Sequence, residues 1–330
     1  EVRTMEQTNR MSFKKFLKAD SLAIIVALIV EIIIFGILSP YFFTSGNLLT
    51  ILQYCALTGL AALPMTLLMI SANFDMSLGS QVALCSCVVG MICRSTDIGW
   101  GTVLLAMVVA IVIGAVCGFI NSFFIMKVNL PPFIATMAMM QALRGCAYLM
   151  TNGQSIMLMS PVFGVLGRGR TFGIPNTVYI FVVFVVIFAF IAKYTVFGRR
   201  AYTIGGNDVA ARLSGINVQR TSMILYMLTG AMCGLVGLLT ASQLGSAIPS
   251  SHNDFAFDVI SAVVLGGVAM NGGKGTIGGT VVGVLVLAIL DNGLIMLNVS
   301  SHWQLVCSGI VLLLAVSIDS LKQMRMKTKG

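Results

Sequence analysis

Charged residues are the component that this sequence has least of. Only 9% of its 330 residues are Asp, Glu, Lys or Arg, whereas an average soluble protein has about 25%. Hydrophobic residues make up 58% and the mean hydropathy is +0.98, and a soluble domain cannot bury that much apolar surface. The composition therefore excludes a soluble enzyme, a secreted disulfide scaffold, a disordered chain and a nucleic-acid-binding domain. It predicts an integral membrane protein that contacts the lipid bilayer and no nucleic acid.

Motifs for catalysis, metal binding and cofactor binding are also missing. The eight cysteines form no C-x-x-C pair and lie mostly inside apolar runs, so we interpret them as small packing residues. Gly273-Lys274 resembles the end of a phosphate-binding loop, but that motif needs Gly where Val268 stands and Ser or Thr where Gly275 stands. We expect no catalytic residue, no metal ion and no cofactor in this chain, and we do not predict an enzyme.

Long apolar runs are what the sequence has instead. A membrane helix needs about 20 mostly apolar residues, and we expect an all-α protein of about ten such helices. The candidate spans are 22–38, 48–70, 77–93, 101–126, 131–150, 177–193, 221–243, 255–271, 276–297 and 303–320. The spans 77–93 and 131–150 are interrupted by polar residues or Pro, and each either crosses the membrane or ends as a half-span.

The cationic residues predict the orientation of these spans. If the spans alternate from an inside N-terminus, sixteen of the 20 Lys and Arg residues lie on the inner side, which is the bias expected of cytoplasmic loops. Both termini are then cytoplasmic, and this bias also explains the net charge of +9. We divide the chain into a cytoplasmic segment 1–20, one transmembrane domain 21–320 with an outer loop 151–176 and an inner loop 194–220, and a cytoplasmic tail 321–330.

A faint internal repeat relates the two halves of the chain. Thr58-Gly59 recurs as Thr229-Gly230, and Asn121 recurs as Asn292 at the same offset. The matched spans run in opposite directions in our topology. The sequence therefore predicts two inverted repeats of five helices each, an architecture common in transporters. Recurrent Gly residues spaced four apart predict close helix packing within the bundle or across a dimer.

The inner loop contains a short capped helix. Asn207 is a good N-cap, Asp208 and Arg212 are spaced to pair on one face, and Gly215 is a natural stop. We predict a helix of about two turns over 208–214. It is either an ordinary loop helix or a docking element for a partner.

Polar groups within the apolar runs are candidates for a transport path. Amide and hydroxyl side chains suit an uncharged, hydroxylated solute, although each one could equally hold two helices together. The candidates are Gln53, Asn73, Asn121, Thr136, Gln141, Gln243 and Asn292. Glu31 and Asp291 lie inside spans, where a charge is costly and often functional, whereas we interpret Asp75 and Asp258 as helix caps at the membrane interface.

Four stretches resemble one known family in combination. They are Asn73–Ser80, Asn129–Thr136, Gly205–Val218 and Phe257–Gly279. They resemble the permease subunit of bacterial ATP-binding-cassette monosaccharide importers of the ribose, xylose, galactose and autoinducer-2 type. One difference stands out: Asn73-Phe74 replaces two small residues, which makes Phe74 a further path candidate that could narrow the path or shift the preferred sugar.

The resemblance implies a complex in the bacterial inner membrane. A second permease subunit, identical or related, would complete the pore. A cytoplasmic ATPase, which itself binds ATP and Mg, would dock on the inner loop, and an extracytoplasmic sugar-binding protein would meet the outer loop 151–176. The implied coupling residues are Gly205, Gly206, Asn207, Asp208, Ala211, Arg212, Leu213 and Gly215.

Two other functions stay open on the sequence alone. A secondary transporter driven by H⁺ or Na⁺ would use Glu31 or Asp291 as its ion site. A membrane scaffold would bind partners through the loops 151–176 and 194–220 and move no solute. The sequence favours the importer permease, in which the chain forms the translocation path and is coupled to its ATPase through residues 205–218.

Overall fold

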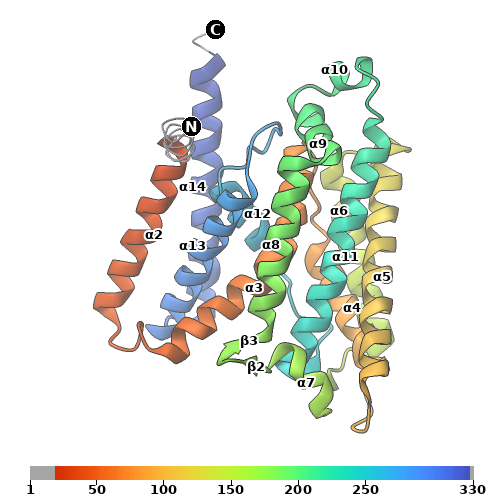
Figure 1. The fold of residues 1–330 in the computed structure, drawn as a ribbon, viewed down its shortest axis with the longest axis vertical. Helices are drawn as coiled ribbons and strands as arrows, with labels where there is room; N and C mark the ends of the chain where they lie inside the picture. Colours follow the sequence, from red (N-terminus) through yellow and green to blue (C-terminus); the bar gives the residue numbers. More distant parts are fainter. Residues whose placement is uncertain (1–18, 328–330) are drawn as a thin grey trace, which may run out of the picture.

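The computed structural model describes residues 19–327, and the described chain is almost entirely helical (Figure 1). The helices are α2 (Ala19–Leu38), α3 (Ser45–Ile70), α4 (Leu78–Ile92), α5 (Trp100–Met126), α6 (Pro132–Thr151), α7 (Pro161–Gly167), α8 (Asn176–Tyr194), α9 (Val196–Gly206), α10 (Asp208–Leu213), α11 (Val218–Leu244), α12 (Phe255–Leu265), α13 (Ile277–Met296) and α14 (Ser301–Lys327). Of the predicted cytoplasmic segments 1–20 and 321–330, residues 1–18 and 328–330 lie outside the described residues. Residues 19–20 begin α2, and residues 321–327 continue α14.

Two small antiparallel ladders complete the described structure. Strand β1 (Ile156–Met157) pairs with β4 (Ser246–Ala247), and β2 (Arg170–Thr171) pairs with β3 (Ile174–Pro175). The first ladder ties the connection after α6 to the end of α11. The second closes a hairpin at Phe172-Gly173, where both residues have positive φ.

The helices are those of a membrane protein. Among the described residues, 6 helices are long and apolar enough to cross a membrane, and the apolar helices Ile24–Leu38, Leu78–Ile92 and Phe255–Leu265 are shorter. The prediction of an all-α membrane protein is confirmed. The expected span 255–271 is wrong in its second half, because α12 ends at Leu265 and a turn of positive-φ glycines follows it.

The bundle has two distinct ends. In Figure 1, α9 and α10 lie at the top, together with the start of α2 and the end of α14, whereas α7, β2 and β3 lie at the bottom. The loops 151–176 and 194–220 are therefore on opposite ends, as the sequence predicts.

Glycines let the central helices α5 and α11 pack backbone to backbone. A Cβ at Gly114 would clash with the Gly230 carbonyl, and a Cβ at Gly234 would clash with the Ala110 carbonyl. Gly283 on α13 approaches the Ala262 carbonyl of α12 in the same way. The predicted glycine packing is thus found inside the bundle.

The helix contacts recur between the two halves of the chain. Helix α11 packs on α4 and α5, and α3 packs in the corresponding way on α12 and α13. Helix α3 ends at the α10 end of the bundle, where the Ile70 carbonyl accepts a hydrogen bond from Gly273 N. Helix α11 begins at that end, so the two are antiparallel. This packing is what inverted repeats require.

Candidate coupling and transport site

Helix α10 is defined by its two ends. The Asn207 side chain accepts a hydrogen bond from Ala210 N at 2.9 Å, so Asn207 is the N-cap. At the other end, Gly215 has φ +77° and its N–H donates to the Arg212 carbonyl. The predicted cap and stop are confirmed, and α10 covers Asp208–Leu213.

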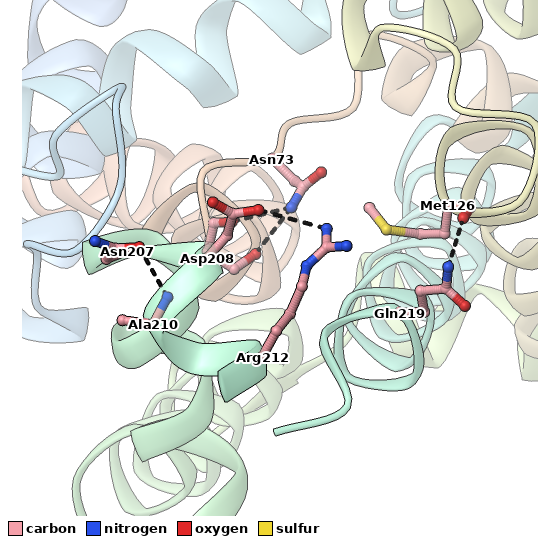
Figure 2. A network of polar contacts seen from close by, with 8 residues as sticks. Asn73, Met126, Asn207, Asp208, Ala210, Arg212 and Gln219 are labelled. Atoms are coloured by element: carbon pink, nitrogen blue, oxygen red, sulfur yellow. Dashed lines mark hydrogen bonds and ion pairs between the residues drawn. The ribbon is translucent and has the colours of Figure 1, made fainter. Parts of the chain in front are cut away.

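One face of α10 is anchored and the other is open. Ala211 is buried in a small cluster with Ile204 and Val218. Asp208 and Arg212 form an ion pair at 3.4 Å (Figure 2), with side chains 55% and 62% exposed. An exposed pair of this kind adds little stability, so both groups remain available to a partner.

Two apolar side chains of α10 also point into solvent. Val209 is 60% exposed and Leu213 is 86% exposed, and their spacing places them on the same side of the helix. Exposed apolar groups beside a charged pair form the usual composition of a protein-binding surface. We name Asp208, Val209, Arg212 and Leu213 the α10 surface.

The base of this element is joined to the membrane helices through backbone contacts. A Cβ at Gly205 would clash with the Ile70 carbonyl of α3 and lie 2.5 Å from Gly273 N. The Tyr202 hydroxyl donates to the Gly275 carbonyl at 2.9 Å, and burial raises the pKa of this phenol. These Gly205 and Tyr202 contacts hold helix α9 against α3 and the turn after α12. Gly206, the next residue, makes no such approach, because nothing lies within 4 Å of a Cβ added there.

The path candidate Asn121 belongs to a buried polar cluster. Its Nδ2 donates to the Asp75 carboxylate at 3.0 Å and to Ser77 Oγ at 2.9 Å. Asp75 is fully buried and also accepts from Ser77 N and Gln81 Nε2. The interpretation of Asp75 as an interface cap is wrong, because the N-cap of α4 is Ser77 and the Asp75 carboxylate is fully buried among side-chain and backbone donors. The cluster fixes the turn between α3 and α4 against α5.

Asn73, Phe74 and Thr136 lie near this turn and the start of α6. Asn73 Nδ2 donates to the Ser71 carbonyl at 3.0 Å, and the Phe74 ring lies 6.4 Å from the Phe133 ring. Thr136 donates to the Pro132 carbonyl of its own helix. Figure 2 also shows Gln219 of α11 donating to the Met126 carbonyl of α5.

The other candidates lie elsewhere in the fold. Gln53 donates to the Gly167 carbonyl at 2.8 Å, and Asn292 donates to the Asn47 side chain at 2.9 Å. Gln141 is exposed and Gln243 is half-buried. The structure therefore does not bring the path candidates together into one site, and their role in transport stays a prediction.

One important side chain was not among the candidates. The Arg144 guanidinium donates to the Pro249 carbonyl at 2.7 Å and to the Ser251 carbonyl at 2.6 Å. An Arg inside an apolar span is itself a signal of function or of a specific partner. Its partners are backbone carbonyls 105 and 107 residues away, and side-chain patterns do not reveal such contacts.

Within residues 19–327, no group of three or more His, Cys, Asp or Glu side chains could hold a metal ion. The arrangement instead combines a bundle of apolar helices with an exposed, capped helix at one end. It defines the chain as a multi-pass membrane protein.

Comparison with known proteins identifies the family. Residues 47–316 match the family described as "Branched-chain amino acid transport system / permease component", and the chain belongs to this permease family. It is 38% identical over 303 residues to the ribose import permease protein RbsC of Escherichia coli strain K12, covering 91% of this chain and 93% of that protein.

Two further relatives support the same assignment. Ribose import permease protein RbsC of Bacillus subtilis strain 168 is 41% identical over 300 residues, 90% of this chain and 92% of that protein. L-arabinose transport system permease protein AraH of Escherichia coli K12 is 33% identical over 309 residues, 94% and 93% of the two chains. No solved structure matches the chain. The predicted resemblance to importer permeases is confirmed.

Proposed function

We propose that this chain is the membrane-spanning permease subunit of an ATP-driven sugar importer in the bacterial cytoplasmic membrane. The family match and the relatives named for ribose and L-arabinose import support this function. Those two sugars are both pentoses, so the substrate that we propose to test first is D-ribose. The chain is not expected to hydrolyse ATP, which is the task of a partner subunit.

The α10 surface is the single observation that carries the coupling role. A permease without an ATP site can change its state only if a partner binds its two states with different affinity. The exposed Val209 and Leu213, beside the Asp208–Arg212 pair, offer such a partner an apolar contact flanked by charge. The Gly205 contacts then connect that surface to α3.

The remaining parts of the complex follow from the two ends of the bundle. The α10 end carries Arg199, Arg200, Arg212 and Arg220, which favours the cytoplasmic side. The start of α2 and the end of α14 lie at the same end (Figure 1), which supports a cytoplasmic location for both. The opposite end presents the 151–176 loop, in which Phe172 is 96% exposed. We assign this end to the extracytoplasmic sugar-binding protein. A second permease subunit, identical or related, completes the pore.

The test replaces the apolar part of the α10 surface. Val209→Ser together with Leu213→Ser should reduce co-purification of the ATPase at least tenfold, because the contact loses its buried apolar area. Membrane level of the permease should not change, since both side chains are exposed. ATP-dependent D-ribose uptake should fall in parallel.

The matched control is Phe172→Ser, which removes an even more exposed apolar side chain at the other end of the bundle. It should leave ATPase co-purification unchanged. If the α10 variant retains the ATPase and transports normally, the coupling role of this surface is wrong. If uptake of D-ribose persists without any ATPase and collapses with an uncoupler, the importer proposal itself is wrong.

A further inference from the structure

A cavity of about 760 Å³ lies between α3, α12, α13 and α14. Its walls include Tyr54 and Thr58 of α3, Ser261 of α12, and Gln304 and Ser308 of α14. The volume falls within the range of about 300–1,000 Å³ that is typical of small-molecule sites. None of the path candidates selected from the sequence lines it.

Three carboxylates belong to the polar lining of this cavity, which also includes His252, Asn253 and Gln304. Asp254, Asp258 and Asp291 all line it, and no Lys or Arg does. Asp258 and Asp291 come from neighbouring helices and lie close enough for their charges to interact. The interpretation of Asp258 as a helix cap is wrong, because the N-cap of α12 is Asp254 and Asp258 lies in its first turn. Within residues 19–327, neither Asp258 nor Asp291 has an ion-pair partner, and both residues line the cavity. Acceptors at this depth in a membrane protein are costly unless a bound group supplies donors.

The cavity also lies beside an interrupted helix. Helix α12 has 11 residues, about 16 Å at 1.5 Å per residue, which is about half of a bilayer about 30 Å thick. The turn that follows it contacts Ile70 at the α10 end of the bundle, so the helix begins inside the bilayer. The chain before it, residues 248–254, is not helical, and Arg144 fixes it through the Pro249 and Ser251 carbonyls. Irregular backbone at this depth is tolerated where it lines a cavity or packs on protein, and interrupted helices commonly form transporter sites.

The apolar and aromatic residues that line the cavity indicate which kind of ligand it fits. Leu57, Val284 and Leu287 are apolar, and Tyr54 and Phe257 contribute aromatic rings. The carboxylates do not form a metal site, since no three His, Cys, Asp or Glu side chains among the described residues are suitably grouped. A sugar combines hydroxyl donors, which carboxylates accept, with an apolar C–H face that suits these walls.

We propose that this cavity binds a neutral, polyhydroxylated solute of monosaccharide size, with the Asp258 and Asp291 carboxylates accepting hydrogen bonds from its hydroxyls. The inference rests on the proposed import function. It places a substrate-binding site of the transport path next to α12. Aromatic and aliphatic walls hold the ring, and the two carboxylates orient it.

The first test uses Asp258→Asn and Asp291→Asn in the full complex of permease, ATPase and binding protein in lipid vesicles. The apparent KM for uptake of radiolabelled D-ribose should rise about tenfold, because an amide replaces one charge-assisted acceptor. Stimulation of the ATPase by the loaded binding protein should persist, since neither residue is near α10. Asp97→Asn is the matched control: Asp97 is exposed in the loop after α4, and its replacement should change neither value.

A second variant blocks the cavity without removing a polar group. Gly309 lines the cavity, and nothing lies within 4 Å of a Cβ added there, so Gly309→Phe should fold and occupy the space. Uptake should fall at least tenfold while ATPase co-purification is retained. Gly101→Phe, at an equally open glycine of α5 outside the cavity, should transport normally.

The outcomes separate this inference from the proposed function. If the wild-type complex transports D-ribose and the cavity variants match their controls, the cavity inference is wrong and lipid or a second subunit fills the space. A requirement of the cavity carboxylates for Na⁺-dependent uptake would also overturn it. If the wild-type complex transports no sugar, the cavity inference is tested separately. Equilibrium binding of a panel of labelled neutral sugars to the purified full chain is then measured. Binding that Asp291→Asn weakens supports the inference, and no binding overturns it.

Discussion

At the scale of single residues, Asp75 shows how the bundle accommodates a charge. Four donors reach its carboxylate, from Ser77 N, Ser77 Oγ, Gln81 Nε2 and Asn121 Nδ2. Asp75→Asn should destabilise the protein by about 2–4 kcal/mol, because the new amide faces amide donors that then lose their acceptor. Unfolding by SDS in mixed micelles measures this change.

Asp97→Asn provides the comparison, since this exposed residue should change the free energy of unfolding by less than about 0.5 kcal/mol. Equal effects of the two substitutions would show that the Asp75 cluster contributes nothing specific to stability.

The sequence could not have predicted the cluster of Asp75 and Asn121. Asp75 and Asn121 are 46 residues apart, and only packing of α3 and α4 against α5 brings them together.

At the scale of elements, α9 and α10 show which features a sequence does predict. The Asn207 cap, the Asp208–Arg212 spacing and the Gly215 stop all act within one or two turns, so local rules located α10. The early end of α12 was missed although its signal is also local. Gly267 has φ +83° and its N–H donates to the Val264 carbonyl, as Gly215 does after α10. The apolar Val268 and Ala269 beyond it extend the hydrophobic run and concealed this stop.

The junction beneath α9 leads to a prediction about coupling. Gly205→Ala should reduce D-ribose uptake about tenfold or more, because its Cβ would push the end of α9 away from Ile70 and Gly273. ATPase co-purification should persist, since the α10 surface is unchanged. The number of D-ribose molecules taken up per ATP hydrolysed, measured in vesicles, shows whether coupling is lost while ATPase binding is kept.

Gly101→Ala is the matched control for this substitution. Gly101 also lies in a helix, α5, and has open space around its Cβ, so uptake should stay within about twofold of wild type. Impaired transport in both variants would indicate a general effect of glycine replacement and would contradict a role for the Gly205 contacts.

At the scale of the whole molecule, the two ends of the bundle differ in charge. The end with α9 and α10 carries the larger group of Arg residues, and the opposite end carries Arg94, Arg168 and Arg170. The sequence predicted this separation because positive loops resist translocation, a rule that needs no knowledge of packing. The ranges of most long helices were also predictable, since apolar length alone sets them.

This asymmetry predicts the orientation of the chain. An epitope tag inserted after Phe172, in the exposed hairpin between β2 and β3, should be cleaved by protease added to intact spheroplasts. A tag inserted after Leu213, at the end of α10, should be cleaved only after the membrane is permeabilised. Immunoblotting with and without detergent measures both. The reverse pattern would place α10 outside the cell, where no cytoplasmic ATPase could reach it, and would contradict the coupling role together with the orientation.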